Sequence, residues 1–458
     1  MNFTLSELAR AVGLPPGAAL VLSGVAVDSR CVRPGELFVA LPGARVDGHD
    51  FAAEAVSRGA AAVLGERRPD RLAADFPVLL VPDAREALLR LAGALKRKWG
   101  FRLAAIAGSA GKTTTKEFAA AILGRRFPVE KTPGNQNSAI GFPMSVVNLP
   151  RVPEWMVGEM GMSARGEISR LTRAFQPDVA TITLVALEHL EFLGSLDGVA
   201  DANAEILEGL KPGGVFVANA DDPRVMAIAA QWGGPVLSFG LSATADVTAD
   251  RVAPDGSGSR IELKTPAGQA EVRVPLPGAH QVSNFLAASA VAIAAGATAA
   301  DCAAAAPELA PASHRGEIRR HASGAILYDD AYNASPPSMR AALDTLELLP
   351  GRRKIAVLGD MLELGPEDLW WHRETGRYVV GRANRLICVG PRARSIGEGA
   401  VEEGFPVGET RYLENPEQAA NLLDSMLAEG DTVLFKASRG VGLERAVQLL
   451  AGGVRRKA

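Results

Sequence analysis

The chain has 458 residues, of which 47% are hydrophobic and 22% are charged, and its formal net charge is −3. This length predicts about two to four domains, and the composition is typical of a soluble globular protein. No stripe of lysine and arginine stands out, and no apolar run reaches the roughly 18 residues of a membrane span, so these features exclude a nucleic-acid-binding surface and a transmembrane protein.

The first section, residues 1–96, is predicted to be a small α/β domain. Its clearest elements are a strand over 36–41, a helix over 51–58 and a strand over 60–64. Two polar loops, at 27–30 and 43–50, lie at strand ends, where open α/β sheets bind ligands. A ligand site and ordinary solvated turns are both compatible with this spacing.

A basic segment at 96–100 marks the expected start of a central domain that extends over residues 97–312. Strands alternate with helices in this domain, which implies a doubly wound, mostly parallel sheet. Residues 246–275 instead alternate polar and apolar side chains around Gly and Pro turns, so we expect an antiparallel insertion there. The clearest strands are 103–107, 178–185 and 214–218, and a helix that should be buried covers 281–295, ended by Gly296.

A glycine-containing turn joins the first of these strands to a helix expected over 113–123, and backbone N–H groups in this arrangement form an anion site. Gly108 and Gly111 lack the side chains that would keep the backbone from closing around phosphate. Lys112 can reach the terminal phosphates, and Thr113 offers a hydroxyl to Mg²⁺. The first glycine of the usual pattern is replaced by isoleucine. Gly-Lys-Thr directly after a strand nevertheless indicates a nucleoside-triphosphate site rather than a plain connecting turn.

The third section, residues 313–458, repeats the α/β rhythm and is predicted to be a second Rossmann-type domain. Its strands are expected at 325–328, 354–358, 386–389 and 432–435. Asp329 and Asp330 follow the first of them and suit a ribose or an amine, with capping of the next helix as the alternative. The basic residues 455–457 are expected to form a solvated tail.

A triphosphate site needs a metal with hard oxygen ligands. Glu159 follows a short apolar run and would point into the cleft, although an isolated glutamate is more often a surface residue. His189 lies just after the strand at 178–185, where catalytic loops occur, and a structural histidine is the alternative. In the helix expected over 197–210, Asn203 falls on the apolar stripe, so its amide must find partners in the core or at an active site.

The cysteines are widely spaced and odd in number, which indicates small buried hydrophobes in a reducing compartment. They are Cys31, Cys302 and Cys388. The first ten residues carry no charged-then-apolar signal pattern. The sequence therefore predicts a cytoplasmic protein, and a monomer is expected because three domains already bury a large surface.

Several stretches together resemble the Mur ligase family over nearly the whole chain. They are residues 108–117, 132–137, 159–168, 189–195, 219–222, 278–284, 329–336, 358–365 and 436–439. The phosphate-binding turn and the glutamate are shared by the whole superfamily. Asp-Asp-Ala-Tyr-Asn at 329–333 and Gly-Asp-Met-Leu-Glu-Leu-Gly at 359–365 resemble the members that add D-alanyl-D-alanine. The Asp-Asn-Pro-Arg motif of the diamino-acid-adding relatives is missing.

This resemblance implies a uridine-nucleotide-binding domain at 1–96, an ATPase domain at 97–312 and a Rossmann-like domain at 313–458. It also implies a ligase whose small-molecule substrates are UDP-N-acetylmuramoyl-tripeptide and D-alanyl-D-alanine. ATP would phosphorylate the free carboxylate of the bound tripeptide, and the dipeptide amine would attack the acyl phosphate through a tetrahedral intermediate. Whether the tripeptide ends in lysine or diaminopimelate is left open.

The resemblance further implies ATP and Mg²⁺ as cofactors and a role for individual residues. Carboxylate and γ-phosphate are both negative, so bringing them together requires concentrated positive charge. The implied catalytic residues are Lys112, Glu159 and His189, and the implied metal ligands are Thr113, Glu159 and His189. The implied ATP-binding residues are Gly108, Ser109, Ala110, Gly111, Lys112, Thr113, Thr114, Asn284, Arg315 and Asp330. The implied substrate-binding residues are Asp28, Ser29, Arg30, Asp47, Gly48, His49, Asn135, Asn137, Tyr332 and Asn333.

One departure from the family pattern is Asn203, which stands where most members carry a lysine that is carbamylated to help hold a second metal. Asparagine cannot be carbamylated. We hypothesise that the Asn203 amide, or a water that it orients, substitutes for the lysine. A second Mg²⁺ near His189 would then be held more weakly.

Two other readings are kept as alternatives. Another ATP-dependent amide ligase of the superfamily, such as a diamino-acid-adding ligase or a folylpolyglutamate synthase, would share the phosphate-binding turn but not the motifs of the third section. A P-loop regulatory protein would need neither the cluster at 329–333 nor a uridine-type N-terminal domain. Phosphate release that depends on both a peptide carboxylate and an amine distinguishes a ligase from the regulatory protein.

Overall fold

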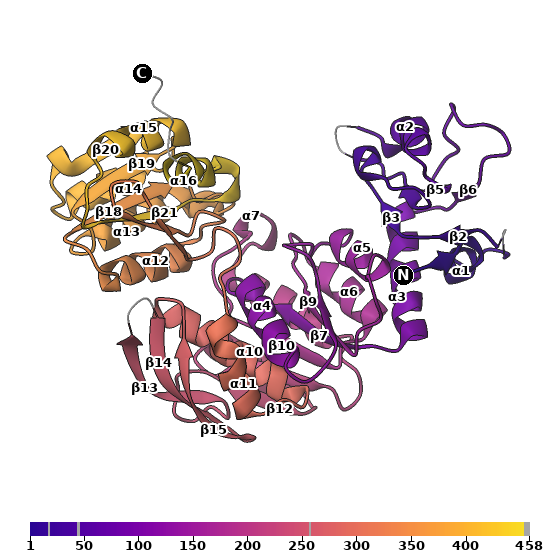
Figure 1. Cartoon of the computed structure of the whole chain (residues 1–458), viewed down its shortest axis with the longest axis horizontal. Coiled ribbons are helices and arrows are strands. Elements are labelled where there is room, and N and C mark those ends of the chain that lie inside the picture. Colours follow the sequence, from indigo (N-terminus) through magenta and orange to yellow (C-terminus); the bar gives the residue numbers. More distant parts are fainter. Residues whose placement is uncertain (17–18, 44–45, 256–257, 453–458) are drawn as a thin grey trace. The chain divides into compact units, whose positions relative to one another are not determined.

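The computed structural model describes residues 1–16, 19–43, 46–255 and 258–452 (Figure 1). The expected basic tail at 455–457 and two residues of the polar loop at 43–50, Ala44 and Arg45, lie outside the described residues. Two compact units make up the chain. Unit 1 comprises Met1–Ala107, Phe127–Ala180 and Glu205–Val215, and unit 2 comprises Gly108–Arg126, Thr181–Ala204 and Phe216–Ala458.

The N-terminal section of unit 1 contains two small sheets. An antiparallel pair, β1 (Phe3–Thr4) and β2 (Val21–Leu22), flanks α1 (Leu5–Ala11). The second sheet is parallel, in the order β3 (Val25–Ala26), β4 (Leu37–Val39), β5 (Ala62–Gly65) and β6 (Val78–Leu80). Phe38 and Val63 of this sheet share a buried core with Ala52 and Ala55 of α2 (Ala52–Ser57). The predicted strand–helix–strand succession of this section is confirmed.

Helix α3 (Ala84–Trp99) contains the basic segment that was expected to mark a boundary, so the division between residues 96 and 97 falls inside a helix. Lys96 is only 4% exposed, and its Nζ donates a hydrogen bond to the Gln176 carbonyl at 3.0 Å. Burial lowers the pKa of Lys96 to about 8. This segment is therefore the last turn of a packed helix and not an open linker.

The central sheet has the strand order β12-β11-β10-β7-β9-β8. In unit 1, β7 (Arg102–Ala107), β9 (Trp155–Glu159) and β8 (Val129–Lys131) pair in parallel. In unit 2, β11 (Val215–Asn219) pairs in parallel with β12 (Val236–Phe239). Unit 1 also holds α5 (Gly141–Val147), α6 (Glu167–Phe175) and the first half of β10 (Val179–Ile182), whose second half belongs to unit 2. The helices of unit 2 that accompany these strands are α4 (Lys112–Leu123), α7 (Leu190–Leu193), α8 (Leu196–Ala204), α9 (Pro223–Gln231), α10 (Ala279–Ala294) and α11 (Ala299–Ala305).

Two expected elements of this section are shorter in the structure. The strand expected over 178–185 ends at Ile182, because the backbone that follows turns to bond the phosphate-binding turn. The helix expected over 197–210 ends at Ala204 and continues as a 3₁₀ turn, Glu205–Leu207. The Glu205 carboxylate accepts hydrogen bonds from backbone N–H groups at the start of α6, which fixes that turn.

The insertion expected at 246–275 is antiparallel, as predicted. It consists of β13 (Thr248–Asp255), β14 (Gly258–Thr265) and β15 (Gly268–Val274). The alanine-rich helix that follows, α10, is buried along most of its length, which confirms the prediction for 281–295.

The C-terminal section, orange to yellow in Figure 1, is a six-stranded sheet in the order β16-β17-β21-β18-β19-β20. The strands are β16 (Glu317–Arg320), β17 (Ile326–Asp329), β18 (Arg353–Gly359), β19 (Arg385–Val389), β20 (Thr410–Leu413) and β21 (Asp431–Lys436). Only β16 is antiparallel to its neighbour. The helices are α12 (Pro336–Leu348), α13 (Asp368–Val379), α14 (Arg394–Glu402), α15 (Pro416–Met426) and α16 (Glu444–Ala451).

Side-chain alternation in this sheet builds a core on each face. Ile355 and Val357 of β18 join a cluster with α15 and α16, whereas Ala356 and Leu358 join one with α12, α13 and α14. Strands buried on both faces between helices are the signature of a Rossmann-type sheet, so the prediction for this section is confirmed.

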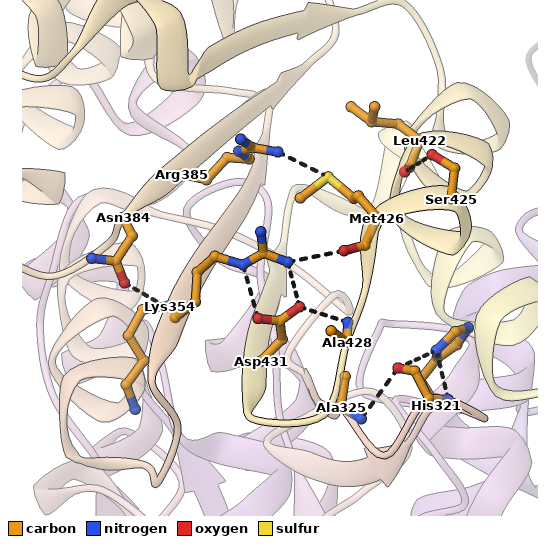
Figure 2. A network of polar contacts seen from close by, with 12 residues as sticks. His321, Ala325, Lys354, Asn384, Arg385, Leu422, Ser425, Met426, Ala428 and Asp431 are labelled. Atoms are coloured by element: carbon orange, nitrogen blue, oxygen red, sulfur yellow. Dashed lines mark hydrogen bonds and ion pairs between the residues drawn. The ribbon is translucent and has the colours of Figure 1, made fainter.

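The amino ends of these strands are joined by the polar network in Figure 2. The guanidinium of Arg353 donates two hydrogen bonds to the Asp431 carboxylate, at 2.8 and 2.5 Å, and a third to the Met426 carbonyl at 2.9 Å. The Ala428 N–H donates to the same carboxylate at 2.9 Å. These groups hold the starts of β18 and β21 together.

Two of the three cysteines are buried, as expected, and burial raises the pKa of the Cys302 thiol to about 11 and that of Cys388 to about 12. The prediction was wrong for Cys31, which is exposed because it ends a 3₁₀ turn in a polar loop. Among the helices that the structure describes, none combines the length and apolarity needed to cross a membrane.

Candidate functional site

The predicted strand–turn–helix is present, with β7 ending at Ala107 and α4 beginning at Lys112. Gly108 and Gly111 have left-handed backbone, with φ of +123° and +82°. A side chain at Gly111 would overlap the Asn284 side-chain oxygen, and one at Gly108 would overlap Thr183. Both positions therefore need glycine for conformation and for space.

The segment that follows β10 fixes the phosphate-binding turn. Thr183 Oγ1 donates to the Ala110 carbonyl at 2.6 Å. Ser109 Oγ donates to the Ala186 carbonyl at 3.0 Å and accepts from the Ala186 N–H at 2.9 Å. Asn219, from the 219–222 motif, donates from Nδ2 to the Thr183 carbonyl at 2.6 Å. That motif thus acts through the segment that holds the turn.

Charges of alternating sign connect Lys112 to His189. Lys112 Nζ donates to the Gly108 carbonyl and lies 3.6 Å from the Glu188 carboxylate. The same Glu188 oxygen is 3.9 Å from His189 Nε2, and His189 Nδ1 is 2.5 Å from Glu363 Oε2. The structure therefore brings these two predicted catalytic residues into one cluster. Sequence reasoning missed Glu188 and Glu363, although Glu363 lies in the 359–365 motif.

Helix α10 connects the phosphate-binding turn to Arg315. Asn284, which approaches Gly111, donates from Nδ2 to Gln281 Oε1 at 3.2 Å. The Gln281 amide nitrogen lies 3.1 Å from where a Cβ on Gly316 would stand, directly after Arg315. Helix α10 therefore approaches both the phosphate-binding turn and the backbone that follows Arg315.

Glu159 lies at the carboxyl end of β9, where its Cα is the register partner of Ile106 in β7. It is 1% exposed, so the alternative of a surface glutamate is wrong. Its N–H donates to Thr132 Oγ1 at 3.2 Å, and Asn137 Nδ2 donates to its Oε1 at 2.8 Å. Asn137 thus orients this carboxylate, while Asn135 is exposed.

The first polar loop of the N-terminal section is held by its own side chains. Asp28 and Arg30 form an ion pair at 2.7 Å, and the hydrogen bond from Arg30 lowers the pKa of Asp28 to about 2. Ser29 is buried and donates from Oγ to Glu54 Oε2 at 2.8 Å. Arg30 remains exposed, so this loop presents a guanidinium to solvent.

The second polar loop contains a buried histidine. His49 Nδ1 lies 2.5 Å from Asp47 Oδ1, and His49 Nε2 accepts from the Glu66 N–H at 2.9 Å. The backbone N–H of His49 also bonds Asp47, which lowers the pKa of Asp47 to about 2. Gly48 N donates to the carbonyl of Leu41 at 2.9 Å, so His49 holds the loop rather than facing solvent.

At the carboxyl end of the C-terminal sheet, Asp330 pairs with Lys436 at 2.5 Å, and Lys436 also donates to the Asn333 carbonyl at 3.0 Å. Ser335 is the residue that caps α12, so the alternative in which Asp329 or Asp330 caps that helix is wrong. Lys436 lies in the 436–439 motif, to which the sequence alone gave no role.

Two guanidinium groups contact the ring of Tyr332. The Arg315 guanidinium carbon lies 4.1 Å from the centroid of its ring, and that of Arg439 lies 4.9 Å away. Cations at this distance are attracted to the face of an aromatic ring. The result is a positively charged surface beside the Asp330–Lys436 pair.

Asn203 is 1% exposed, and its Nδ2 donates to the Val199 carbonyl, one turn earlier in α8, at 2.9 Å. The sequence allowed partners in the core or at an active site, and the amide nitrogen finds its partner in the buried backbone of its own helix.

Three family descriptions match the chain in succession. They are "Mur ligase family, catalytic domain" over residues 21–96, "Mur ligase middle domain" over 106–292, and "Mur ligase, glutamate ligase domain" over 314–439. Together they agree with the expected three-domain order of a small N-terminal sheet, a central sheet and a C-terminal sheet.

Curated relatives match over nearly their full length. The UDP-N-acetylmuramoyl-tripeptide–D-alanyl-D-alanine ligase of Bacillus subtilis is 37% identical, covering 93% of each chain, and that of Escherichia coli is 36% identical, covering 98% of each. The crystal structure of MurF from Acinetobacter baumannii matches with a TM-score of 0.88 and 30% identity, covering 99% of each chain. The MurF ligase of Thermotoga maritima, solved in complex with ADP, matches with a TM-score of 0.82 and 29% identity, covering 95% of this chain and 98% of that one.

Proposed function

The chain belongs to the Mur ligase family, and from that premise we propose that it joins D-alanyl-D-alanine to UDP-N-acetylmuramoyl-tripeptide with conversion of ATP to ADP and phosphate. The observation that carries this proposal is the full-length similarity to ligases of that name, at 36–37% identity. The phosphate-binding turn, with Lys112 at the N-terminus of α4, supports the use of a nucleoside triphosphate.

The proposed reaction has two steps. A carboxylate oxygen of the tripeptide attacks the γ-phosphorus of ATP, giving an acyl phosphate and ADP. The free amine of D-alanyl-D-alanine then attacks the carbonyl carbon, and the tetrahedral intermediate expels phosphate to leave the new amide. The first step brings two anions together, so positive charge fixed in advance at the site lowers its barrier.

Lys112 and the N–H groups of the turn would stabilise charge on the phosphates during this step. Glu188, 3.6 Å from the Lys112 ammonium, would keep that side chain near the turn. Arg315 and Asp330 would bind the nucleotide, with Asp330 accepting hydrogen bonds from the ribose hydroxyls. The polar loops that carry Ser29 and His49 would receive the uridine nucleotide.

Thr113 and Glu159 fit Mg²⁺, because a hydroxyl and a carboxylate buried to 1% exposure offer the hard oxygen donors that this ion prefers. His189 would add an imidazole nitrogen, which is a softer donor. When bound, Mg²⁺ would neutralise phosphate charge and polarise the γ-phosphoryl group. Asn137, which donates to Glu159 Oε1, would orient that ligand.

Asn203 would leave a second metal more weakly held than the carbamylated lysine of most family members. Metal titration by calorimetry compares the wild type with Asn203→Lys in the presence of bicarbonate. We expect a weaker second site in the wild type. If both sites fill equally tightly in the two proteins, this part of the proposal is wrong.

We further propose that the domains divide near residues 96 and 312 and that the protein is a cytoplasmic monomer. The family descriptions, which span 21–96, 106–292 and 314–439, support these divisions. The cytoplasm is where the nucleotide-linked substrate and ATP would be available.

The test is phosphate release with ATP, Mg²⁺ and UDP-N-acetylmuramoyl-tripeptide, with and without D-alanyl-D-alanine. Release that requires the dipeptide, together with a product heavier by the dipeptide minus one water, is the expected result. Stimulation by a diamino acid or glutamate instead would identify a sister ligase. Absence of stimulation by every acid–amine pair would reject the ligase.

A further inference from the structure

His314 lies in an unusual position for a residue with a side chain, because its φ of +60° is in the left-handed region. Its imidazole Nδ1 is 2.7 Å from Oδ2 of Asp329, at the carboxyl end of β17. The Asp329 side chain is completely buried. A buried carboxylate holds its hydrogen-bond partner firmly, so this pair fixes the backbone at residue 314.

The pair also ties together two segments that carry the nucleotide-site residues. The Gly316 N–H donates to the Asp329 carbonyl at 2.9 Å, and the Tyr332 N–H donates to the His314 carbonyl at 3.1 Å. Arg315 lies between these two attachments, with its guanidinium 4.1 Å from the centroid of the Tyr332 ring. The backbone is thus anchored on both sides of Arg315.

A metal site is the competing explanation for the same residues. His314, Glu317 and Asp329 offer ligand atoms that all lie within 4.8 Å of one another. However, Arg319 already supplies positive charge there, with Nη2 at 2.9 Å from Glu317 Oε2 and Nε at 3.7 Å from Asp329 Oδ2. A guanidinium in this place satisfies the carboxylates and disfavours a second cation.

We propose that His314 is a positioning residue, which, held by Asp329, keeps the left-handed turn that directs Arg315 onto Tyr332 and toward the nucleotide. The proposal rests on the proposed function, because Arg315 is expected to bind the nucleotide. For this role, position 314 needs a residue that tolerates the left-handed backbone and also donates a hydrogen bond to Asp329. Histidine and asparagine meet both needs, whereas glycine meets only the first.

The test compares His314→Gly and His314→Asn with the wild type by calorimetric binding of ADP, by KM for ATP and by kcat. We expect His314→Gly to weaken ADP binding and raise KM for ATP about tenfold, with a much smaller change in kcat. His314→Asn should bind nearly as the wild type does. The matched control is His321→Asn, which alters a histidine–aspartate pair (His321 Nε2 to Asp424, 3.2 Å) at the other end of the sheet, and should leave ADP binding unchanged.

A second measurement separates positioning from a general loss of structure. In an Arg315→Ala background, His314→Gly should weaken ADP binding no further, because the two residues act through one interaction. Additive losses, unchanged binding by His314→Gly, or equal losses in His314→Asn would overturn the proposal. So would stabilisation by Zn²⁺ or Mg²⁺ alone that His314→Gly abolishes. A wild type that binds no ADP would instead reject the proposed function.

Discussion

The two ends of the strands in the C-terminal sheet use the same kinds of residue in different ways. At the amino ends, Arg353 and Asp431 form a two-bond pair between strands that start side by side, and backbone groups complete it (Figure 2). At the carboxyl ends, Asp330 and Lys436 also form an ion pair, but Asp330 is on a loop beyond β17. Arg315 and Arg439 are partnered there by the Tyr332 ring.

The difference shows how one fold separates stability from function. At the amino ends, the charges of Arg353 and Asp431 satisfy one another, so this pair stabilises the sheet. At the carboxyl ends, Asp330 lies on a loop, and the guanidinium groups of Arg315 and Arg439 contact an aromatic ring. A phosphate or a ribose can replace such contacts. In parallel α/β sheets ligands bind at this end of the strands.

The largest effect is expected from Gly111→Ala, in the turn that joins the carboxyl end of β7 to α4. The added methyl group would overlap the Asn284 oxygen on a backbone of φ +82°. Displacement of the phosphate-binding turn by about 1 Å should lower kcat/KM at least about 100-fold. Steady-state phosphate release measures it.

Gly381→Ala is the matched control for that variant. Gly381 has φ of +83° with no atom within 4 Å of an added Cβ, and it lies just before the amino end of β19. The substitution should lower the free energy of unfolding by about 1 to 2 kcal/mol and leave kcat/KM unchanged. Equal losses of activity in both variants would contradict a separation between the carboxyl and amino ends of the parallel strands, in the central sheet and in the C-terminal sheet alike.

Asp330→Asn should have the next largest effect. If Asp330 accepts hydrogen bonds from the ribose hydroxyls, loss of its charge removes a charge-assisted hydrogen bond of about 1.5 to 3 kcal/mol. KM for ATP should therefore rise about 10-fold to 100-fold. Some stability should also be lost, because Lys436, at 3% exposure, loses its anionic partner. An unchanged KM for ATP in the folded protein would exclude Asp330 from the nucleotide site.

Asp431→Asn tests the amino ends. The carboxylate is 5% exposed and accepts bonds from Arg353 and from Ala428, so its replacement should lower the free energy of unfolding by about 2 kcal/mol. Urea unfolding measures this change. The kcat and the KM values for all three substrates, expressed per folded molecule, should match the wild type. A rise in KM for ATP would show that this end also contributes to binding.

The sequence was sufficient for features that depend on periodicity and local turn chemistry. Strand alternation predicted the C-terminal sheet, and Gly-Lys-Thr after a buried strand predicted the turn before α4. It was not sufficient where tertiary bonds end an element early. The strand at β10 stops at Ile182 because Thr183 bonds the phosphate-binding turn, a contact between residues more than 70 positions apart.

The same limit applies to the candidate site. In the sequence, Glu188 and Glu363 look like ordinary surface glutamates. Only the fold brings the Glu188 carboxylate to Lys112 and the Glu363 carboxylate to His189. His314 belongs to none of the motifs, and the feature that distinguishes it is a left-handed backbone, which sequence spacing does not reveal. Partnerships between distant side chains, more than the elements themselves, had to come from the structure.

The smallest predicted effect concerns pH. As pH falls, the contributions of Asp329 and Asp431 to the free energy of unfolding should change in opposite directions. Burial raises the pKa of Asp329, more than His314 lowers it. For Asp431 burial is likewise the largest single influence, but the bonds from Arg353 and Ala428 together outweigh it and lower the pKa. An unfolded chain titrates its aspartates near pKa of about 3.9. The stability from Asp431 is therefore present above that pH and is lost as pH falls, whereas that from Asp329 is present below it and is lost as pH rises through the folded pKa.

Urea unfolding of the wild type, Asp431→Asn and Asp329→Asn at pH 7, 5 and 4 checks this difference. The stability gap between the wild type and Asp431→Asn should shrink on acidification, because protonation removes the same charge that the substitution removes. The gap between the wild type and Asp329→Asn should move the opposite way, in favour of the wild type at low pH. If both stability gaps shift in the same direction with pH, the pKa values of Asp329 and Asp431 are shifted alike. The difference between the amino and carboxyl ends of the sheet would then not extend to the protonation of these carboxylates.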